Sequence, residues 1–339
     1  MSHEASNDGV RLLSHRPSVL FKVEHHATVP SGDIATEGVV VSGPGWGERL
    51  REVLAGLSHA ERAYLFAVRL DDETGLPLPA QTLLDRARTD WFPRFLSQGQ
   101  LAPVFQPIID LRTGAVYARE ALARGRMGKV EVRGAELLEA AEAHDALFSF
   151  DPRTRAAALE AGLPRLPAGE LLFVKLDPRG VIDVDGSLRS VWPVVERCGA
   201  APSSVGLELM GAERHPDLGL LEALVGAHRE QGAVISLDDL SAGGDALRVV
   251  EALRPSVAKL SLHLCKGLDA SPARRALVAA LVELAHELEC RVVAVGIERD
   301  SDLEQVQALG IDLGQGFYLG QPTEEMLPVD ARLVARAGV

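Results

Sequence analysis

Two neighbouring aspartates give the first sign of chemistry in this sequence. Asp238 and Asp239 follow the apolar run "AVISL" and come just before the small residues "SAGG". Carboxylates at the end of a buried strand repel each other and lose hydration, so they need a cation, hydrogen-bond donors or open water beside them. We therefore expect these two acids to belong to a larger group of polar side chains.

Polar residues also lie at or near the ends of several other short apolar runs. A strand-end charge taken alone is usually a solvated charge on the rim, but the coincidence on many strands predicts that the side chains meet in one site. These residues are Glu120, Lys175, Glu208, Lys259, Glu298 and Gln315.

The elements that must position these residues follow from the order of the apolar runs. Short β-branched runs alternate with helix-like stretches over more than two hundred residues, which predicts a mainly parallel α/β fold. About eight strands without a glycine-rich phosphate fingerprint favour a closed (β/α)8 TIM-like barrel. The tight connection "RTG" predicts that the first strand is antiparallel to the second. The carboxyl ends of barrel strands meet at one rim, so the polar residues should meet there.

The first 90 residues are expected to form an N-terminal extension, partly disordered and then mainly helical, ahead of a barrel over residues 91–339. "SVLFKVEHHATV" and "GVVVSG" are strand-like, whereas "GERLREVLAGL" has helical spacing. "SHAERAYLFAVRL" is predicted to be a helix because Ser58 and Glu61 have capping-box spacing. "PAQTLLDRARTDWFPRFLSQG" predicts a helix that is interrupted at Pro93.

Composition excludes several classes of protein. The 339 residues are 47% hydrophobic with a formal net charge of -13, which argues against a nucleic-acid polymer as partner. Cys198, Cys265 and Cys290 are far apart and form no CxxC motif, so we expect neither a disulfide framework nor a zinc site. No apolar run reaches the length of about 18 residues that spans a membrane. We therefore expect a cytoplasmic protein with no membrane partner.

Longer stretches resemble a known family. "FQPIIDLRTGAVYAREALARG" is similar to the opening of EAL domains, which hydrolyse the bacterial second messenger cyclic di-GMP, and Glu120, Ala121 and Leu122 spell the family name. The resemblance continues in order through "GLELM", "SLDDLSAGG", "VAKLS", "VVAVGIE" and "ALGIDLGQGFYLGQP". It covers residues 91 to 325.

The resemblance implies a set of metal and catalytic positions. EAL enzymes use two divalent cations, Mg²⁺ or Mn²⁺, which share the water that attacks phosphorus. Lys259 matches a lysine near that water, and Glu298 matches a polar support at the rim. The positions that match metal ligands are Glu120, Glu208, Asp238 and Asp239.

It also implies a set of contacts to the nucleotide. Arg124 falls where the family reaches a phosphate, and Gln315 is a further polar group at the rim. The positions that match ligand contacts are Gln106, Glu120, Leu122, Arg124 and Gln315.

Two departures from the family concern the metals directly. Lys175 stands where the family has an asparagine ligand, and Val295 stands where it has a glutamate that binds the second metal. An ammonium cannot coordinate a cation, and at about 4 Å it repels each unit of positive charge by about 4 kcal/mol at an effective dielectric near 20. We therefore expect a compromised metal site with no cofactor, although an active enzyme would use Mg²⁺ or Mn²⁺.

Lys175 also suggests how the acids are neutralised. We hypothesise that its ammonium replaces a metal among Glu120, Glu208 and Asp238, while Lys259 compensates Asp239.

Other departures affect the loop after the aspartates. Gly211 replaces a second acid that braces that loop in the family, and the loop itself lacks the family's aromatic residues. Ser261 replaces an aspartate beyond Lys259.

These observations leave three functions open. The first is a catalytically impaired EAL domain that acts as a cyclic di-GMP receptor or signalling adaptor. The second is an interaction scaffold that has lost the ligand. The third is an active cyclic di-GMP phosphodiesterase with an atypical metal site. A protein partner that binds the N-terminal extension, and a homodimer, also remain open.

Overall fold

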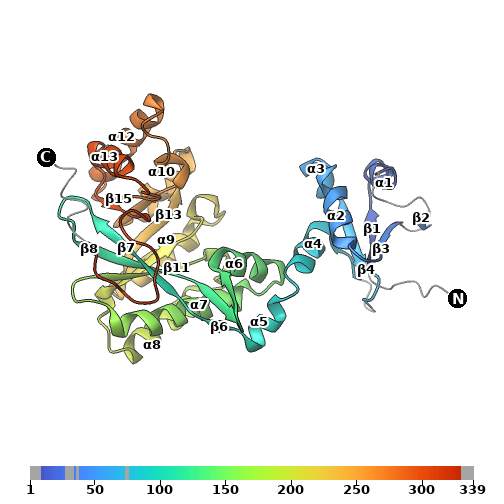
Figure 1. Cartoon of the computed structure of the whole chain (residues 1–339), viewed down its shortest axis with the longest axis horizontal. Helices are drawn as coiled ribbons and strands as arrows, with labels where there is room; N and C mark the ends of the chain where they lie inside the picture. The colour runs from blue at the N-terminus through green and yellow to red at the C-terminus, as the bar shows by residue number, and fades with distance from the viewer. Residues whose placement is uncertain (1–8, 27–33, 36–37, 73–75, 330–339) are drawn as a thin grey trace. The chain divides into compact units, whose positions relative to one another are not determined.

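The computed structural model describes residues 9–26, 34–35, 38–72 and 76–329. It divides into two compact units (Figure 1). Each unit has its own apolar core. Unit 1 consists of residues 1–97 and 139–145, and unit 2 consists of residues 98–138 and 146–339.

Unit 1 is built on a five-stranded antiparallel sheet with the strand order β2-β3-β1-β4-β5. Alternate residues of the strands, such as Val10 and Leu12 of β1, are buried in its core. Its elements are β1 (Gly9–Ser14), α1 (Pro17–Glu24), β2 (Ile34–Ala35), β3 (Gly38–Ser42), α2 (Trp46–Ala55), α3 (His59–Arg62), β4 (Leu65–Arg69), β5 (Leu78–Pro79), α4 (Ala80–Arg88) and α5 (Phe92–Gln98).

The expectation of a mainly helical extension missed the sheet, because the described part of unit 1 combines its helices with five strands. The capping box of Ser58 and Glu61 is present, but it begins only the four-residue helix α3. The apolar residues that follow alternate instead, with Leu65 and Ala67 buried, and they pair with β1 as strand β4. "SVLFKVE" forms helix α1 rather than a strand.

Other expectations for this part of the chain were confirmed. "GVVVS" forms β3, and helix α2 lies in the predicted segment. The third predicted helix is interrupted, but the break lies at residues 89–91, and Pro93 is the second residue of α5, where the first turn tolerates proline. The prediction of partial disorder near the N-terminus does not hold for residues 9–26, which contain β1 and α1, and its remainder at residues 1–8, 27–33 and 36–37 lies outside the described residues.

Unit 2 contains the closed eight-stranded barrel that the sequence predicts, in the order β11-β12-β13-β14-β15-β16-β7-β8. β7 is antiparallel to both neighbours, as expected for the first strand, and the other neighbouring pairs are parallel. The barrel strands are β7 (Val104–Asp110), β8 (Val116–Leu122), β11 (Leu171–Leu176), β12 (Val205–Leu209), β13 (Val234–Leu240), β14 (Val257–Leu260), β15 (Arg291–Ala294) and β16 (Leu313–Gly314).

Helices follow most barrel strands on the outside of the barrel (Figure 1). They are α7 (Leu147–Gly162), α8 (Val184–Arg197), α9 (Leu218–Glu230), α10 (Gly244–Leu253), α11 (Leu262–Cys265), α12 (Pro272–Glu287) and α13 (Asp300–Ala308), with short 3-10 turns η1 (Leu163–Arg165), η2 (Pro178–Gly180), η3 (Pro202–Ser204) and η4 (Ala212–Arg214). Helix α6 (Gly134–Ala143) precedes α7, and its residues from 139 onward belong to unit 1. A small antiparallel sheet is formed by β6 (Gln100–Leu101), β9 (Arg124–Met127) and β10 (Val130–Arg133). No helix in the described part of the chain is long and apolar enough to cross a membrane.

The barrel strands bury one apolar cluster that includes Phe173, Val257 and Val293. Gly206 lies beside Phe173, and a side chain at this glycine would collide with the phenylalanine ring. Because side chains alternate along a strand, the residues two positions further toward the carboxyl ends form the next layer. That layer carries the polar residues.

Candidate functional site

One side chain from each barrel strand, or from the residue just beyond it, forms a ring at the mouth of the barrel. Strand register places Gln106 opposite Glu120 and Lys175 opposite Glu208. Seven of the eight side chains are polar, and the remaining one is a valine. The ring consists of Gln106, Glu120, Lys175, Glu208, Asp238, Lys259, Val295 and Gln315.

Lys175 is central to this ring. Its Nζ lies 2.9 Å from Glu120 Oε1, 3.5 Å from Glu208 Oε2 and 2.5 Å from Asp238 Oδ2. Its side chain keeps 29% of its surface exposed, whereas that of Glu208 is fully buried. The hypothesis that Lys175 neutralises Glu120, Glu208 and Asp238 therefore agrees with the geometry, because its ammonium contacts these three of the four predicted metal ligands.

Lys259 contacts the same three acids from deeper in the barrel. Its Nζ lies 2.8 Å from Glu120 Oε2, 3.0 Å from Glu208 Oε1 and 3.7 Å from Asp238 Oδ1. We call these five residues, Glu120, Glu208, Asp238, Lys175 and Lys259, the charged cluster. It places three carboxylates against two ammonium groups.

The protonation of the cluster follows from burial and from these contacts. Burial raises the pKa of Glu120, but Lys175 and Lys259 outweigh it and hold the pKa below its usual range. Burial and the charge of Glu120 raise the pKa of Glu208 to about 7. Burial lowers the pKa of each lysine, but the surrounding carboxylates raise it by more. The pKa of both lysines therefore lies above its usual value, and both remain charged. Glu208 is therefore the acid of the cluster that takes up a proton most readily.

The acids by themselves are a suitable donor set for a hard cation. One oxygen each from Glu120, Glu208 and Asp238 lie within 4.8 Å of one another, and Mg²⁺ or Ca²⁺ binds oxygens at about 2.0–2.6 Å. The same three carboxylates, however, are in contact with the ammonium groups of Lys175 and Lys259. An ion at this point would compete with two positive charges for the same space, so the arrangement does not fit a divalent cation while both lysines remain.

Asp239 diverges from its neighbour Asp238. The pairing of β13 with β14 shifts between Leu237 and Leu240, and Asp239 takes a left-handed conformation with φ 57°, which aspartate tolerates better than most residues. Asp239 is consequently exposed. The expectation that Lys259 compensates Asp239 was wrong, since no ion pair joins them in the described part of the chain.

Two glutamines connect the cluster to the last barrel strand. Gln315 Nε2 donates to Glu120 Oε2 at 2.6 Å and to Gln106 Oε1 at 3.3 Å. Gln106 Nε2 donates in turn to the carbonyl of Gly320 at 3.1 Å. The structure thus brings together Gln106, Glu120 and Gln315 from the predicted ligand contacts.

Other predicted site residues have contacts elsewhere. Arg124 lies on β9, where its guanidinium donates to the carbonyl of Ala123 and approaches Glu131. Glu298 is exposed and pairs with Lys266 at 3.0 Å. Leu122, at the end of β8, is half-buried and pairs in register with Val104.

Glu213 is a polar residue of the mouth that the sequence prediction missed. One of its carboxylate oxygens accepts from the backbone N–H of Ser241 at 2.5 Å and the other accepts from the Ser241 hydroxyl at 2.7 Å. The loop after the two aspartates is therefore held by an acid, although Gly211 had suggested that it was not. The sequence does contain a signal for this contact, because Glu213 comes two residues after Gly211, the position at which the family has its acid.

Arg155 of α7 is a second missed residue. Its Nη1 donates to Asp151 Oδ2 at 2.6 Å and to the backbone carbonyl of Lys175 at 3.0 Å, and its Nη2 donates to Ser190 Oγ at 3.2 Å. Ser190 donates onward to the carbonyl of Ser187. The strand end that carries Lys175 is fixed through its main chain by this guanidinium.

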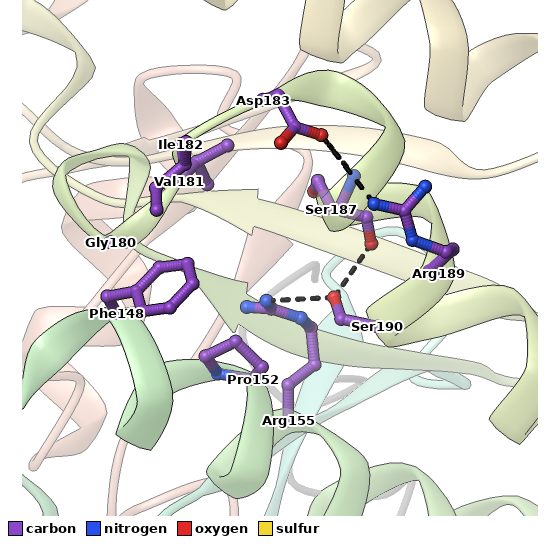
Figure 2. A pocket seen from close by; sticks show the side chains of 11 residues that line it. Phe148, Pro152, Arg155, Gly180, Val181, Ile182, Asp183, Ser187, Arg189 and Ser190 are labelled. Atoms are coloured by element: carbon purple, nitrogen blue, oxygen red, sulfur yellow. Dashed lines mark hydrogen bonds and ion pairs between the residues drawn. The ribbon is translucent and has the colours of Figure 1, made fainter.

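A cavity of about 320 Å³ lies between α7 and the start of α8 (Figure 2). Its polar lining is engaged in internal contacts, because Arg155 bonds Ser190 and Asp183 caps α8 through the N–H of Gly186. Phe148 and Ile182 at its edge are more than half exposed. Since most of its polar groups bond one another and no cluster of carboxylates lines it, we place the chemistry at the barrel mouth instead.

The fold and this ring define a (β/α)8 barrel whose mouth holds clustered carboxylates. The family model described as the EAL domain matches residues 89–322. The chain belongs to the EAL domain family.

Curated relatives point to the same family. The chain is 25% identical over 239 residues to the probable cyclic di-GMP phosphodiesterase PdeG of Escherichia coli, a match that covers 68% of this chain and 46% of the relative. It is 28% identical over 228 residues to the cyclic di-GMP phosphodiesterase PA2567 of Pseudomonas aeruginosa, covering 66% and 38%. The chain thus spans less than half the length of these two relatives.

Solved structures share the barrel. A standalone EAL protein from Vibrio cholerae in its c-di-GMP-bound form superposes with a TM-score of 0.61 and 21% identity, covering 69% of this chain and 97% of the other. The YkuI protein of Bacillus subtilis, in complex with c-di-GMP and calcium, gives a TM-score of 0.63 and 20% identity, covering 73% and 62%. These likenesses establish the fold.

Proposed function

We propose that this protein is a catalytically impaired EAL domain that binds cyclic di-GMP as a receptor or signalling adaptor. The observation that carries the proposal is the position of Lys175 Nζ, within 2.5–3.5 Å of the three acids that the family resemblance assigns to a metal. Two further metal positions that the resemblance implies are also altered. Val295 cannot bind a cation, and the side chain of Asp239 is exposed, away from the charged cluster.

The loss of hydrolysis follows from the chemistry of an ammonium. A divalent cation activates water by coordinating it and lowering its pKa, and it stabilises the charge that develops on phosphate oxygens. An ammonium has no vacant coordination position, so it neutralises the acids without generating a nucleophile. The charged cluster therefore lacks the agent that would attack phosphorus.

Binding of a phosphodiester is compatible with the same arrangement. Lys175 is the partly open cation of the cluster, with 29% of its side chain exposed at the mouth. It can donate to a phosphate oxygen without a metal, as lysines do in many phosphate sites. We therefore propose that the protein binds its ligand without a cofactor.

The relatives support cyclic di-GMP as the ligand that we propose. The solved Vibrio cholerae and Bacillus subtilis proteins are c-di-GMP complexes, and the curated relatives named above are described as phosphodiesterases of this dinucleotide. Unit 1 has its own sheet and core, and we propose that it binds a protein partner.

Calorimetry with cyclic di-GMP, in EDTA and in excess Mn²⁺, tests the proposal together with a turnover assay for the linear dinucleotide. We expect equal binding in both conditions and no turnover. Turnover in Mn²⁺ that disappears in Glu120→Ala would establish an active phosphodiesterase instead. Absence of binding in both conditions would establish a scaffold that has lost the ligand.

The variant Lys175→Asn tests the role of the ammonium separately. Without it the three acids regain an oxygen ligand, so Mn²⁺ at about 100 times its Kd should stabilise the variant by about 2.7 kcal/mol, observed as a rise in Tm. Wild type and the matched rim variant Lys266→Asn should show no such rise. An equal rise in wild type would contradict the proposal.

A further inference from the structure

The cavity between α7 and the start of α8 has the size of a small-molecule site (Figure 2). Its volume is about 320 Å³, and ligand pockets in proteins commonly occupy about 300 to 1,000 Å³. It lies within unit 2, and none of the ring residues at the barrel mouth lines it. A molecule held there would therefore be a second ligand, separate from a dinucleotide at the mouth.

One wall of the cavity is apolar and partly open to solvent. Phe148, in the first turn of α7, is 55% exposed, and Ile182, just before α8, is 70% exposed. Val181 is half-buried and lines the same wall. Gly180 lets this loop approach α7, since a Cβ at the glycine would lie 3.3 Å from the carbonyl oxygen of Leu147. Apolar side chains on such a wall gain free energy when a ligand removes them from water.

Arg155 lines the same cavity, and one edge of its guanidinium is incompletely bonded. Its Nη1 donates to Asp151 and to the carbonyl of Lys175, which fixes the group in place. On the other edge, Nη2 lies 3.2 Å from Ser190 Oγ, and Nε has no hydrogen-bond partner in the described part of the chain. Two neighbouring N–H groups of a guanidinium match the two oxygens of a carboxylate. A buried donor without a partner costs free energy, which an acceptor in the cavity would recover.

A second guanidinium lies at the opening of the cavity. The Arg189 side chain is 71% exposed, and its Nη2 is 3.9 Å from Asp183 Oδ1, which is too long for a hydrogen bond. An exposed ion pair of this length contributes little, so Arg189 is available to a ligand. Among the described residues, Asp183 is the one acid that lines the cavity, and its Oδ1 already accepts from the N–H of Gly186 at 2.6 Å. The lining therefore carries two guanidinium groups against one carboxylate.

We infer that this cavity binds a small carboxylate that carries an apolar group, such as an aromatic acid. The carboxylate accepts from the Nε and Nη2 edge of Arg155 and faces Arg189, while the apolar group packs against Phe148 and Ile182. Figure 2 shows Phe148 and Ile182 on one side of the cavity and Arg189 and Ser190 on the other, with the Arg155 guanidinium between them. Inorganic phosphate fits less well, because its charged oxygens would face the apolar wall.

Calorimetry of the full chain with sodium benzoate tests this site. A ligand this small should bind with a Kd on the order of 1 mM. Benzamide has nearly the same shape but no charge, so it should bind at least about 10-fold more weakly. Absence of benzoate binding, or equal affinity for benzoate and benzamide, would overturn the proposal. Neither result depends on whether cyclic di-GMP binds at the barrel mouth.

Two variants locate the bound benzoate. Phe148→Ala shortens the apolar wall and Arg189→Ala removes the cation at the opening, so each should weaken benzoate binding roughly 3- to 10-fold. The matched controls are Phe21→Ala in unit 1 and Arg197→Ala on α8, where Arg197 pairs with Glu160 and does not line the cavity. Both controls should bind benzoate as wild type does, and circular dichroism checks that every variant is folded. Unchanged affinity in both Phe148→Ala and Arg189→Ala would show that benzoate binds elsewhere and would overturn the assignment of the cavity.

Discussion

Two groups of buried charges in the barrel differ in a way that separates structure from function. The Arg155 network, consisting of Asp151, Arg155, Ser187, Ser190 and His228, sets one guanidinium against one carboxylate. The charged cluster sets three carboxylates against two ammonium groups. Arg155 has 1% of its side chain exposed, but Lys175 has 29%. A balanced, closed pair serves packing, whereas the exposed part of Lys175 leaves a charged group within reach of a ligand.

The largest expected effect comes from a substitution that breaks the pair of Arg155 and Asp151. Arg155→Met leaves Asp151 buried without its partner and frees the carbonyl of Lys175, so unfolding should become easier by about 5 kcal/mol. Urea denaturation measures this loss. The double variant Arg155→Met with Asp151→Leu should recover most of the stability, because it removes both charges. A loss below about 1 kcal/mol in the single variant would contradict the closed structural role.

Removal of Lys259 tests the cluster in the same way. Lys259→Met leaves three acids with Lys175 alone, and we expect a loss of about 4 kcal/mol in the free energy of unfolding, partly relieved because one acid can take up a proton. Lys266→Met is the control, since that lysine forms an exposed ion pair and should cost about 0.5 kcal/mol or less. Equal losses in the two variants would show that the cluster is not a coupled unit.

A pH dependence sharpens the description of the Arg155 network. Burial, aided by the charge of Arg155, lowers the pKa of His228 from 6.5 to about 4. The folded state therefore favours neutral histidine, and this contribution is complete above pH 6.5 and is lost as the pH falls toward 4. The difference amounts to about 3 kcal/mol. His228→Gln should remove this part of the pH dependence in urea titrations between pH 7 and pH 4, and an unchanged slope would contradict it.

The smallest effect concerns the edge of the cluster. Glu213→Ala removes both acceptors of Ser241 and should cost about 1 to 2 kcal/mol. Hydrogen exchange of the Ser241 amide should become faster, whereas Glu213→Gln should keep part of its protection. Unchanged exchange in the alanine variant would show that this carboxylate does not hold the loop.

The barrel and most of its ring could be predicted from the sequence. The carboxyl ends of barrel strands meet at one rim, and this does not depend on the details of the helices between the strands. Glu120, Lys175 and Glu208 needed only their place at the ends of apolar runs. The partner of Lys259 could not be predicted, since the register shift that turns Asp239 outward depends on a backbone conformation that neighbouring residue types leave open.

Unit 1 was harder to predict for a local reason. The segment from Ser58 to Arg69 combines a helix-start signal with apolar residues that satisfy helical and strand spacing alike, and pairing with β1 decides between them. Such a choice is made by residues far away in the sequence. Arg155 was missed because nothing near it in the sequence signals that its target is a main-chain carbonyl.

Unit 1 is made of two separate segments of the chain, which has a consequence for how the protein can be divided. Residues 139–145 belong to unit 1, where Arg86 binds Asp145 and the carbonyl of Ala143, and the chain enters α7 immediately afterwards. Arg155 lies on that same helix and donates a hydrogen bond to the backbone carbonyl of Lys175. Residues 139–145 therefore link the two units by chain connections separate from the one near residue 97, and a fragment that begins at residue 98 would keep this segment but lose Arg86, its partner in unit 1.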